Sequence, residues 1–403
     1  MQTVSIPWAM WYGDRFDLTL PDSWDVTVTR MAGGPDIGEA GIRDALASPI
    51  GAPPLRELAK GRRDAAIAID DLSRPTPAYR VLPLILEELA AGGIDEDRVV
   101  VIVATGAHHA LRREDWVRKI GADLTDRLDI RSHNPTENLE FYGTSSVGAP
   151  IWINRDFVRA DLRIGAGMIM PRGGGFGGGS KIVLPGISGR ESIFFNHYYC
   201  PPERFAAHIE EVGRIAGLEY IVNPLLNEQA DVMAMVAGDP IQAFAAGVER
   251  AKTMYATEMP EGLDIALCNA WPKDTDAHQI SMARVPLFGT KKDVVKPDGT
   301  IVTISACPEG AGYHLVMGPG TRFRERTGRQ IGAAFSGYGA KEVEARNILF
   351  SPGVNAREVK LLYGDQYVHF TAWDDVVAEL VRRHGDAAKV GVFPHGALQH
   401  AAG

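Results

Sequence analysis

The sequence predicts an α/β protein of two domains with mostly parallel sheets and a cleft between them. Short runs of apolar, often β-branched residues alternate with amphipathic stretches of helical length, which is typical of parallel strands connected by helices. The alternation stops and begins again after residue 260. At about 150 residues per domain, the 403 residues suffice for two or three domains.

The first predicted domain, residues 1–260, contains two strands that are apolar throughout. Residues 65–69 (AAIAI) and 99–104 (VVVIVA) have no polar position, so we expect both faces of these strands to be buried. Between them, Pro75 favours the start of a helix and Gly92 its end. A second helix is expected after the second strand, which gives the order strand, helix, strand, helix.

The second predicted domain, residues 261–403, repeats this pattern. A turn rich in Pro and Gly separates it from the first domain. Apolar runs that we expect to be strands then follow at residues 265–268, 300–304, 359–363 and 390–393.

Composition excludes several classes of function. The chain carries 42 Lys and Arg against 51 Asp and Glu, and basic residues do not gather with aromatic ones, so no nucleic-acid surface is expected. No run reaches the ~18 apolar residues of a membrane span, and the N-terminus lacks the pattern of a signal peptide. The three cysteines, Cys200, Cys268 and Cys307, form no CxxC pair, so neither a disulfide framework nor a zinc site is expected. The simplest expectation is a cytoplasmic protein.

Polar side chains follow the two apolar strands of the first domain. Asp71, Ser73 and Arg74 come after the first strand, and His108 and His109 after the second. Ligands of parallel sheets bind beyond the carboxyl ends of the strands, so we expect these residues to share a crevice. Asp71 and Ser73 are open to two interpretations, helix capping or ligand contact. Arg74 is well placed to bind a carboxylate or phosphate, with a surface ion pair as the alternative.

One of the two adjacent histidines is a candidate general base. The ordinary pKa of imidazole lies near neutrality, which suits proton transfer at physiological pH. The glycine at position 106 lets the chain turn sharply before them. The alternative is that both are polar loop residues without a chemical role.

The strongest local signal is a Gly-rich segment at residues 170–186 (MPRGGGFGGGSKIVLPG). Six glycines in seven positions free backbone N–H groups to approach an anion, and Lys181 adds a cation or an amine nucleophile. The segment lacks the Gly-Lys-Ser/Thr order of a nucleotide triphosphate loop. A flexible linker is the alternative, but the apolar residues that follow at once favour a binding loop. His197 follows 16 residues after Lys181, as either a half-buried structural histidine or a metal ligand.

Taken together, these motifs resemble the nickel-pincer lactate racemase family. The order and spacing of the motifs are more specific than any one of them, and further similarity at residues 269–279 and 295–312 extends the resemblance over most of the chain. The motifs are Asp71-x-x-Arg74-Pro-x-Pro, Gly106-x-His108, Gly175-Phe-x-Gly-Gly-x-Lys181-x-x-x-Pro-Gly186 and His197.

The resemblance implies a nickel-bearing organic cofactor. In that family it is pyridinium-3,5-bisthiocarboxylic acid mononucleotide, which binds Ni(II) through two sulfurs and one ring carbon. By this likeness, Lys181 bonds covalently to the nickel-pincer nucleotide as a thioamide, and His197 supplies the fourth ligand of a square-planar nickel. Proteins that build the cofactor are implied as transient partners. The phosphate and sugar regions are expected to contact Asp71 and the loop 173–180, in particular Gly177, Gly178, Gly179 and Ser180.

The resemblance also implies a reaction and a role for each domain. The family removes a hydride from the carbinol carbon of a 2-hydroxy acid, while a histidine takes the hydroxyl proton. His108 is then one base, Arg74 binds and polarises the substrate, and Gln279 contacts the carboxylate. The domain of residues 1–260 carries most cofactor contacts, and the domain of residues 261–403 closes the substrate cleft.

Two departures from the family pattern bear on the substrate. Where the family usually has a second catalytic histidine, this chain has Pro171 and Arg172, and guanidinium is a poor proton acceptor. Where the family tends to have a lysine three residues after the glutamine, this chain has Met282. We expect Arg172 to supply the lost positive charge from another wall. Candidates for the second acid or base are His109, Tyr198, His278 and His314.

The resulting expectation is a racemase or epimerase of a 2-hydroxy acid other than lactate. Two alternatives stay open at this point. One is a 2-hydroxy-acid oxidoreductase that uses the same cofactor, and the other is a non-catalytic binder or carrier of the nickel-pincer nucleotide. The side chain of the substrate and the oligomeric state are left open by the sequence.

Overall fold

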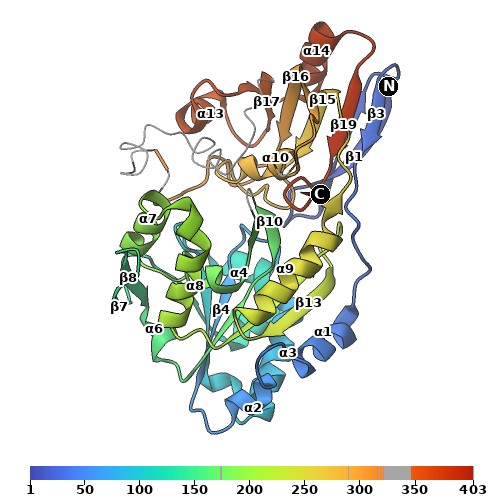
Figure 1. Ribbon diagram of the computed structural model, residues 1–403. Coiled ribbons are helices and arrows are strands. Elements are labelled where there is room, and N and C mark those ends of the chain that lie inside the picture. The colour runs from blue at the N-terminus through green and yellow to red at the C-terminus, as the bar shows by residue number, and fades with distance from the viewer. Residues whose placement is uncertain (173–174, 289, 317, 320, 322–345, 403) are drawn as a thin grey trace.

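The chain folds around two six-stranded sheets, one in each lobe of the molecule (Figure 1). The computed structural model describes residues 1–402 except 173–174, 289, 317, 320 and 322–345. Within this part of the chain, no helix is both long and apolar enough to cross a membrane. The predicted α/β class with large, mostly parallel sheets is confirmed.

The first sheet has the strand order β13-β12-β9-β4-β5-β6, and only β13 runs antiparallel to its neighbour. In β4, Ile67 and Ile69 pack into the core on one face, and Ala66 and Ala68 into the core on the other. The absence of polar residues from positions 65–69 of this strand follows from burial on both faces. Its strands are β4 (Ala65–Asp70), β5 (Val99–Ala104), β6 (Asp129–Ser132), β9 (Leu162–Ala166), β12 (Tyr220–Leu226) and β13 (Val232–Gly238).

Helices cover both faces of this sheet. The first core holds apolar residues of α1 (Gly38–Ala47), α2 (Leu55–Ala59), α3 (Ala78–Ala91), α4 (Arg113–Ile120), α5 (Ala122–Arg127) and α9 (Gln242–Met254). The second core holds those of α6 (Arg155–Arg159), η2 (Gly179–Ile182), α7 (Arg190–Tyr198) and α8 (Phe205–Ile215).

The second sheet is parallel throughout, with the order β18-β17-β16-β15-β19-β3. Its strands are β3 (Asp25–Val28), β15 (Leu263–Asn269), β16 (Val295–Ile304), β17 (Arg346–Phe350), β18 (Val368–Phe370) and β19 (Lys389–Phe393), accompanied by α13 (Ala356–Tyr363) and α14 (Trp373–His384). Small ladders pair β1 (Gln2–Trp8) with β2 (Asp14–Leu20), β7 (Leu139–Thr144) with β8 (Pro150–Asn154), β10 (Met170–Arg172) with β11 (Gly175–Gly177), and β14 (Ala256–Thr257) with β20 (His400–Ala401). Short helices are η1 (Glu96–Arg98), η3 (Pro202–Arg204), η4 (Ile280–Arg284) and α10 (Val285–Phe288).

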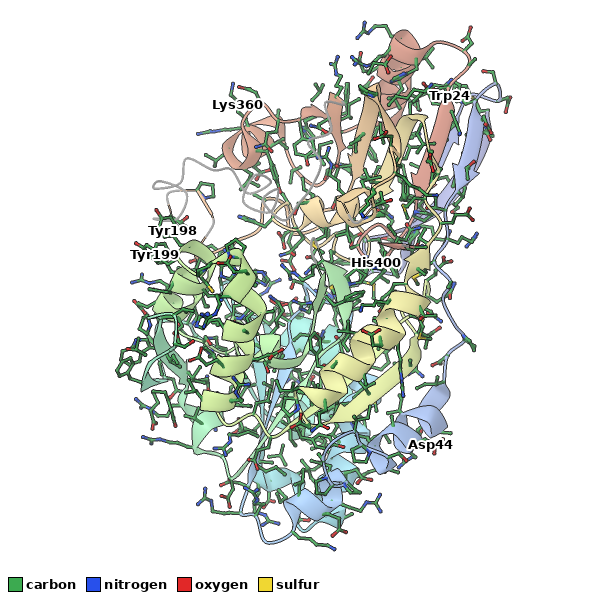
Figure 2. The ribbon with its side chains drawn as sticks, in the orientation of Figure 1. Trp24, Asp44, Tyr198, Tyr199, Lys360 and His400 are labelled. Carbon is green, nitrogen blue, oxygen red and sulfur yellow. The ribbon has the colours of Figure 1, made fainter. Side chains whose placement is uncertain are left out.

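The first strands of the chain lie in the second lobe, beside its last large strand. β3 pairs with β19, and in Figure 1 the blue strands stand next to the red one before the chain descends to α1. Trp24 is buried just before β3, and its Nε1 donates to the carbonyl of Gly385 after α14 at 3.0 Å (Figure 2). The division of the chain into two domains at residue 260 stays a prediction. That prediction did not include the pairing of the N-terminal strand β3 with the second sheet.

Most predicted strands are confirmed, and one is wrong. Residues 65–69, 99–104, 265–268, 300–304 and 390–393 lie in β4, β5, β15, β16 and β19. Residues 359–363 belong to α13 instead. Asn355 begins that helix with a capping box to Glu358, and its buried residues Val359, Leu362 and Tyr363 have helical spacing. The helices after β4 and β5 are confirmed as α3 and α4.

Candidate functional site

A cavity of about 380 Å³ lies between the two lobes, lined from both. Segments after β4, β5 and β9 line it from the first sheet, and segments after β15 and β16 from the second, so carboxyl ends of strands from both sheets converge there. The volume suits a small molecule or cofactor. The predicted site residues among its lining are Asp71, Arg74, His108, Arg172, Gly178, Gly179, Ser180, Lys181, His197 and Gln279.

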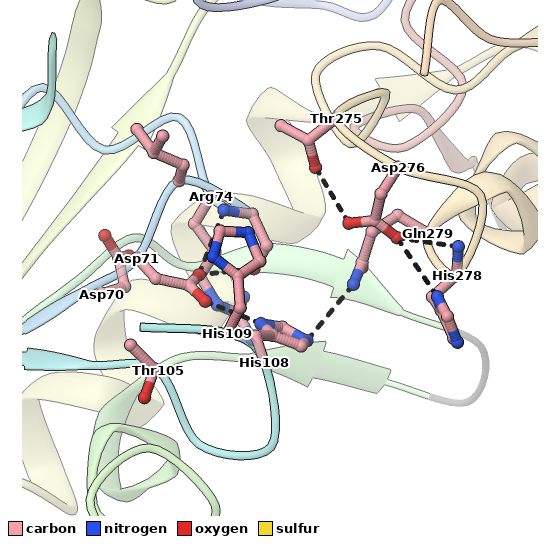
Figure 3. Close-up of polar contacts among 12 residues, drawn as sticks. Asp70, Asp71, Arg74, Thr105, His108, His109, Thr275, Asp276, His278 and Gln279 are labelled. Atoms are coloured by element: carbon pink, nitrogen blue, oxygen red, sulfur yellow. Dashed lines mark hydrogen bonds and ion pairs between the residues drawn. The ribbon is translucent and has the colours of Figure 1, made fainter. Parts of the chain in front are cut away.

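His108 is held between the two lobes by side chains of both (Figure 3). Its Nδ1 lies 2.6 Å from Oδ2 of Asp71, and its Nε2 lies 3.3 Å from Nε2 of Gln279. A carboxylate only accepts, so Nδ1 carries the proton and Nε2 accepts from the Gln279 amide. A carboxylate that orients an imidazole in this way is the usual arrangement behind a general base.

Asp71 does not cap the helix that follows it. The N-cap of α3 is Pro77, whereas Oδ1 of Asp71 accepts from the amide and the hydroxyl of Ser73 at 3.0 and 2.6 Å. Burial raises the pKa of Asp71, but the His108 charge and hydrogen bond, the Ser73 hydrogen bond and the Lys273 charge outweigh it, so the pKa lies below its ordinary value. The carboxylate is therefore ionised at neutral pH and keeps His108 oriented.

The loop that carries Asp71 and Arg74 is fastened by a buried ion pair. Lys119 of α4 has no exposed surface, and its Nζ lies 2.5 Å from Oδ1 of Asp70 and also donates to the carbonyls of Asp71 and Arg74. The other oxygen of Asp70 accepts from Thr76 Oγ1 at 2.6 Å. In the described structure Nη1 of Arg74 is buried without a hydrogen-bond partner, which leaves a guanidinium donor available for a ligand that enters the cavity.

The described part of the Gly-rich loop brings its backbone close to other residues. Gly178 and Gly179 have φ of +143° and +53°, and a Cβ on either would lie within 3.0 Å of the Phe244 ring. The amide of Gly179 donates to Asn223 Oδ1 at 3.0 Å. Gly177 does not line the cavity; a Cβ there would collide with Arg172, so it makes room for that side chain. The start of the predicted loop, residues 173 and 174, lies outside the described residues.

Lys181 reaches the cavity from η2, directly after the glycines. Desolvation lowers its pKa well below the ordinary value, and the nearby charges of Arg172, Arg74 and Lys273 lower it further. The Nζ lies 5.4 Å from the centre of the Phe205 ring. The lowered pKa favours the neutral amine, which is the nucleophilic form.

His197, on the last turn of α7, lines the same cavity as Lys181. Its Nδ1 donates to the carbonyl of Ile193 at 2.8 Å, which leaves Nε2 with a free lone pair in the neutral ring. Burial lowers the pKa of His197 to about 4, the Ile193 hydrogen bond opposes this, and the charges of Lys181 and Arg172 add to the lowering. A neutral imidazole fixed through one nitrogen is the form that binds a metal.

Lys273 is a cavity residue that sequence reasoning missed. It follows β15, is 4% exposed, and donates to the carbonyl of Ser73 in the other lobe. Burial, and then the charge of Arg74, lower its pKa well below the ordinary value, while Asp71 opposes this. The sequence signal that could have identified Lys273 was its position just after a strand of the second sheet, because ligands of parallel sheets bind beyond the carboxyl ends of the strands. With Arg74 and Arg172 it places three basic side chains on the cavity lining.

The four candidates for the second acid or base divide into two pairs. His278 and His314 line the cavity; His109 and Tyr198 do not. The His314 ring centre lies 5.5 Å from that of His108 and 5.9 Å from that of His278. His109 instead binds Glu309 at 2.8 Å, and Tyr198 stacks on Phe194 at the end of α7 (Figure 2).

Similarity to known proteins agrees with the motifs. Residues 12–206 match the family model described as Lactate racemase N-terminal domain. The chain is 29% identical over 294 residues to a lactate racemase of Lactiplantibacillus plantarum, covering 68% of each protein. It is 27% identical over 333 residues to a lactate racemase of Thermoanaerobacterium thermosaccharolyticum, covering 77% of this chain and 76% of that protein.

Solved structures show the same fold. The lactate racemase apoprotein from Thermoanaerobacterium thermosaccharolyticum superposes with a TM-score of 0.76 at 22% identity, over 99% of this chain and 100% of that one. A protein from Thermotoga maritima superposes with a TM-score of 0.68 at 16% identity, over 92% and 99% of the two chains. From the sequence motifs, the family model and the curated relatives, the chain is a homologue of the lactate racemase family.

Proposed function

We propose that this protein is a racemase or epimerase of a 2-hydroxy acid other than lactate, acting by reversible hydride transfer with a nickel-pincer nucleotide. The observation that carries the proposal is the pairing of Asp71 and His108 in the same cavity as Lys181 and His197. The first pair provides an oriented proton acceptor. The second provides an amine and an imidazole suited to a covalently held, metal-bearing group. Homology to racemases supports the reaction class.

The residues of the cavity fit the proposed cofactor. Among the described residues no group of three or more His, Cys, Asp or Glu side chains could hold a metal, and the proposed cofactor would itself supply the other ligands of a nickel at His197. Lys181 is a desolvated amine on the lining of the same cavity. His197 Nε2 would bind the nickel, and Lys181 would form the covalent link. When bound, the cofactor supplies a centre that accepts a hydride and returns it.

The chain's own residues would bind, orient and deprotonate the substrate. Arg74 would bind the carboxylate through its buried guanidinium donor. His108 Nε2 would take the hydroxyl proton, and the charge formed on the ring would be stabilised by Asp71. Gln279 comes from the second lobe and contacts the same nitrogen, so it would help to place the hydroxyl. Enclosure between the lobes would limit the access of water during hydride transfer.

Two cavity residues support a substrate other than lactate. Arg172 brings a second guanidinium beside Arg74, with both side chains close to Gly177. Met282 is half-buried on η4 and lines the wall where the family pattern has a cation. An additional cation on one wall and an apolar side chain on another change which substrate side chains are accommodated.

The cofactor is tested by mass spectrometry of the Lys181 peptide and by nickel analysis. The protein is produced together with proteins that build the cofactor, which are its proposed transient partners. We expect a covalent mass increase at Lys181 and bound nickel. Lys181→Ala loses both, His197→Ala keeps the adduct but loses nickel, and Lys252→Ala on the exposed face of α9 matches the wild type. An unmodified Lys181 without nickel would refute the cofactor.

The reaction is tested with loaded protein and single enantiomers of a panel of 2-hydroxy acids. Chiral chromatography is expected to show conversion to the other enantiomer for an acid other than lactate. Stoichiometric release of 2-oxo acid would instead identify an oxidoreductase. Absence of both, with retained isotope at the carbinol carbon, would identify a binder or carrier.

A further inference from the structure

We infer that Trp11 is a positioning residue of the candidate active site, which holds the loop of residues 71–74 from the second lobe. The inference rests on the function proposed above, because that loop carries Asp71 and Arg74. Trp11 lies in the turn between β1 and β2, and its indole Nε1 donates to the carbonyl of Leu72 at 2.6 Å. It is not among the described residues that line the cavity, so it acts through the loop and not on a ligand.

The turn that carries Trp11 is fixed to the second lobe. Ile6 of β1 and Leu18 of β2 are buried in a core that they share with β15, β16 and β19. The segment after β15 also binds the turn itself, since Oδ1 of the buried Asp274 accepts from the amide of Met10 at 3.2 Å. The indole therefore reaches the loop of the first lobe from a support in the other lobe.

Each of the four carbonyls of residues 71–74 accepts a hydrogen bond from a side chain. Lys119 of the first lobe donates to the first and the last of them, at 3.1 and 2.8 Å. Trp11 and Lys273, both of the second lobe, donate to the two carbonyls between them. Buried carbonyls that are not paired within a sheet or helix need such donors. The shape of the loop therefore depends on donors from both lobes.

The Trp11 ring also covers the ammonium group of Lys119. The centre of the ring lies 5.2 Å from Nζ of Lys119, within the range of a cation–π contact. One indole thus supports the loop twice, directly at Leu72 and through the lysine that binds the carbonyls on either side. Leu72 is 4% exposed, so loss of the indole N–H leaves its carbonyl without this donor in a place that water reaches poorly.

The loop matters for the proposed reaction because of the two residues that it presents to the cavity. Asp71 orients His108, and Arg74 is the proposed ligand of the substrate carboxylate. Misplacement by about 1 Å can reduce a rate by up to ~10²-fold. The loss of one neutral hydrogen bond corresponds to a smaller effect, roughly 3- to 10-fold. We therefore expect loss of the indole N–H to lower turnover through its effect on the contact of Asp71 with His108.

The first test measures the loop itself, on cofactor-free protein. The amides of Ser73 and Arg74 bond to Asp71, so their hydrogen exchange reports the shape of the loop. Exchange in a peptide that contains them is measured by mass spectrometry. We expect faster exchange in Trp11→Phe, which lacks the N–H, than in the wild type. The control is Trp24→Phe, because Trp24 makes the same kind of bond, to the carbonyl of Gly385, at the outer end of the second lobe (Figure 2).

The second test is a double-mutant cycle on loaded protein. The effect of Trp11→Phe on kcat is measured in the wild type and in Asp71→Asn. We expect a roughly 3- to 10-fold loss in the wild-type background. In Asp71→Asn the same change should alter kcat by about twofold or less, because the contact that Trp11 preserves is already lost. A purely structural role of Trp11 would give the same loss in both backgrounds.

The outcomes separate this inference from the proposed function. Loop exchange in Trp11→Phe equal to that of the wild type overturns the inference, and so does an equal loss of kcat in both backgrounds of the cycle. A wild-type protein that interconverts no 2-hydroxy acid refutes the proposed function, and the exchange experiment then still decides whether Trp11 holds the loop. Thermal unfolding shows whether Trp11→Phe is folded. If it is not, Lys273→Met removes the other donor of the second lobe and should accelerate exchange in the same peptide.

Discussion

Oδ2 of Asp71 lies 2.6 Å from Nδ1 of His108, a contact between the residues that follow two neighbouring parallel strands. Both strands end at the same edge of the sheet, so the contact follows from the topology. Ser73 occupies the other carboxylate oxygen, which fixes the direction in which the carboxylate points. Asp71 therefore orients the imidazole of His108 through Nδ1, and the accepting Nε2 faces Gln279 and the cavity.

Replacement of Asp71 by Asn is expected to reduce turnover strongly without loss of cofactor. The amide can donate to His108, which favours the wrong tautomer, and it cannot stabilise the imidazolium. General acid–base catalysis contributes ~10²–10⁴-fold, so we expect kcat to fall by about 10²-fold or more. Steady-state rates and the Lys181 adduct are measured together. Glu309→Gln, which alters the carboxylate beside His109, is the control and should change kcat little.

The buried pair of Lys119 and Asp70 is expected to matter for both stability and site geometry. Lys119→Met leaves the Asp70 charge buried without its partner, which typically costs ~3–5 kcal/mol. The double variant with Asp70→Asn removes that charge and should recover part of the loss. Urea unfolding of the cofactor-free protein measures both. Equal stability of the single variant and the wild type would show that the pair contributes little.

The strands predicted from sequence were those with an unambiguous physical signature. Residues 65–69 of β4 and all of β5 are apolar because helices cover both faces of their sheet, and this is visible within five or six consecutive residues. The 359–363 run was misassigned because five residues are too few to separate period 2 from period 3.6. The decisive signal was the cap at Asn355, outside the run.

Long-range pairing could not be predicted from local sequence. β3 is four residues long and pairs with β19, which follows more than 350 residues later. Nothing in Asp25–Val28 indicates which strand it joins. The same limit explains why the sequence places residues 1–260 in one domain, although β3 pairs in the second sheet.

The site residues that could be predicted from the sequence are reactive side chains that directly follow a strand end or a run of glycines. Asp71, Arg74, His108 and Lys181 have such positions, and all line the cavity. Lys119 and Lys273 were missed because their importance depends on burial, and an isolated lysine in a sequence is most often solvated.

Stability near the contact of the two lobes is expected to depend on pH through His109. Its Nε2 and Nδ1 face Glu309 and the Ala110 carbonyl, so the ring donates from both nitrogens when protonated. The Glu309 hydrogen bond, opposed by burial, raises the pKa of His109 to about 9. Its contribution is therefore full below the ordinary pKa of about 6.5 and is lost as the pH rises through about 9.

The size of this effect is limited by solvent, since the His109 side chain is 41% exposed. Exposed ion pairs contribute about 1 kcal/mol or less. Thermal midpoints of the wild type and His109→Gln are measured across this pH range. The difference between them should shrink toward alkaline pH, and a constant difference would contradict the assignment.

The reactivity of Lys181 is expected to depend on Arg172. Burial is the main cause of the lowered pKa of Lys181, and among the nearby charges that of Arg172 lowers this pKa most. Arg172→Gln removes that charge, so the pKa of Lys181 rises and less of the amine is neutral at a given pH. Since only the neutral amine attacks an electrophile, the pH dependence of modification should move to higher pH.

This shift is measurable on cofactor-free protein, because Lys181 is partly accessible from the cavity. The protein is treated with fluorodinitrobenzene over a range of pH, and the Lys181 peptide is quantified by mass spectrometry. Arg250→Gln on α9, where the arginine binds the Met235 carbonyl, controls for loss of a positive charge elsewhere. An unchanged profile in Arg172→Gln would mean that desolvation alone sets the reactivity of Lys181. A shift would show that the arginine found in place of the family's histidine has acquired a role in preparing the amine for covalent attachment.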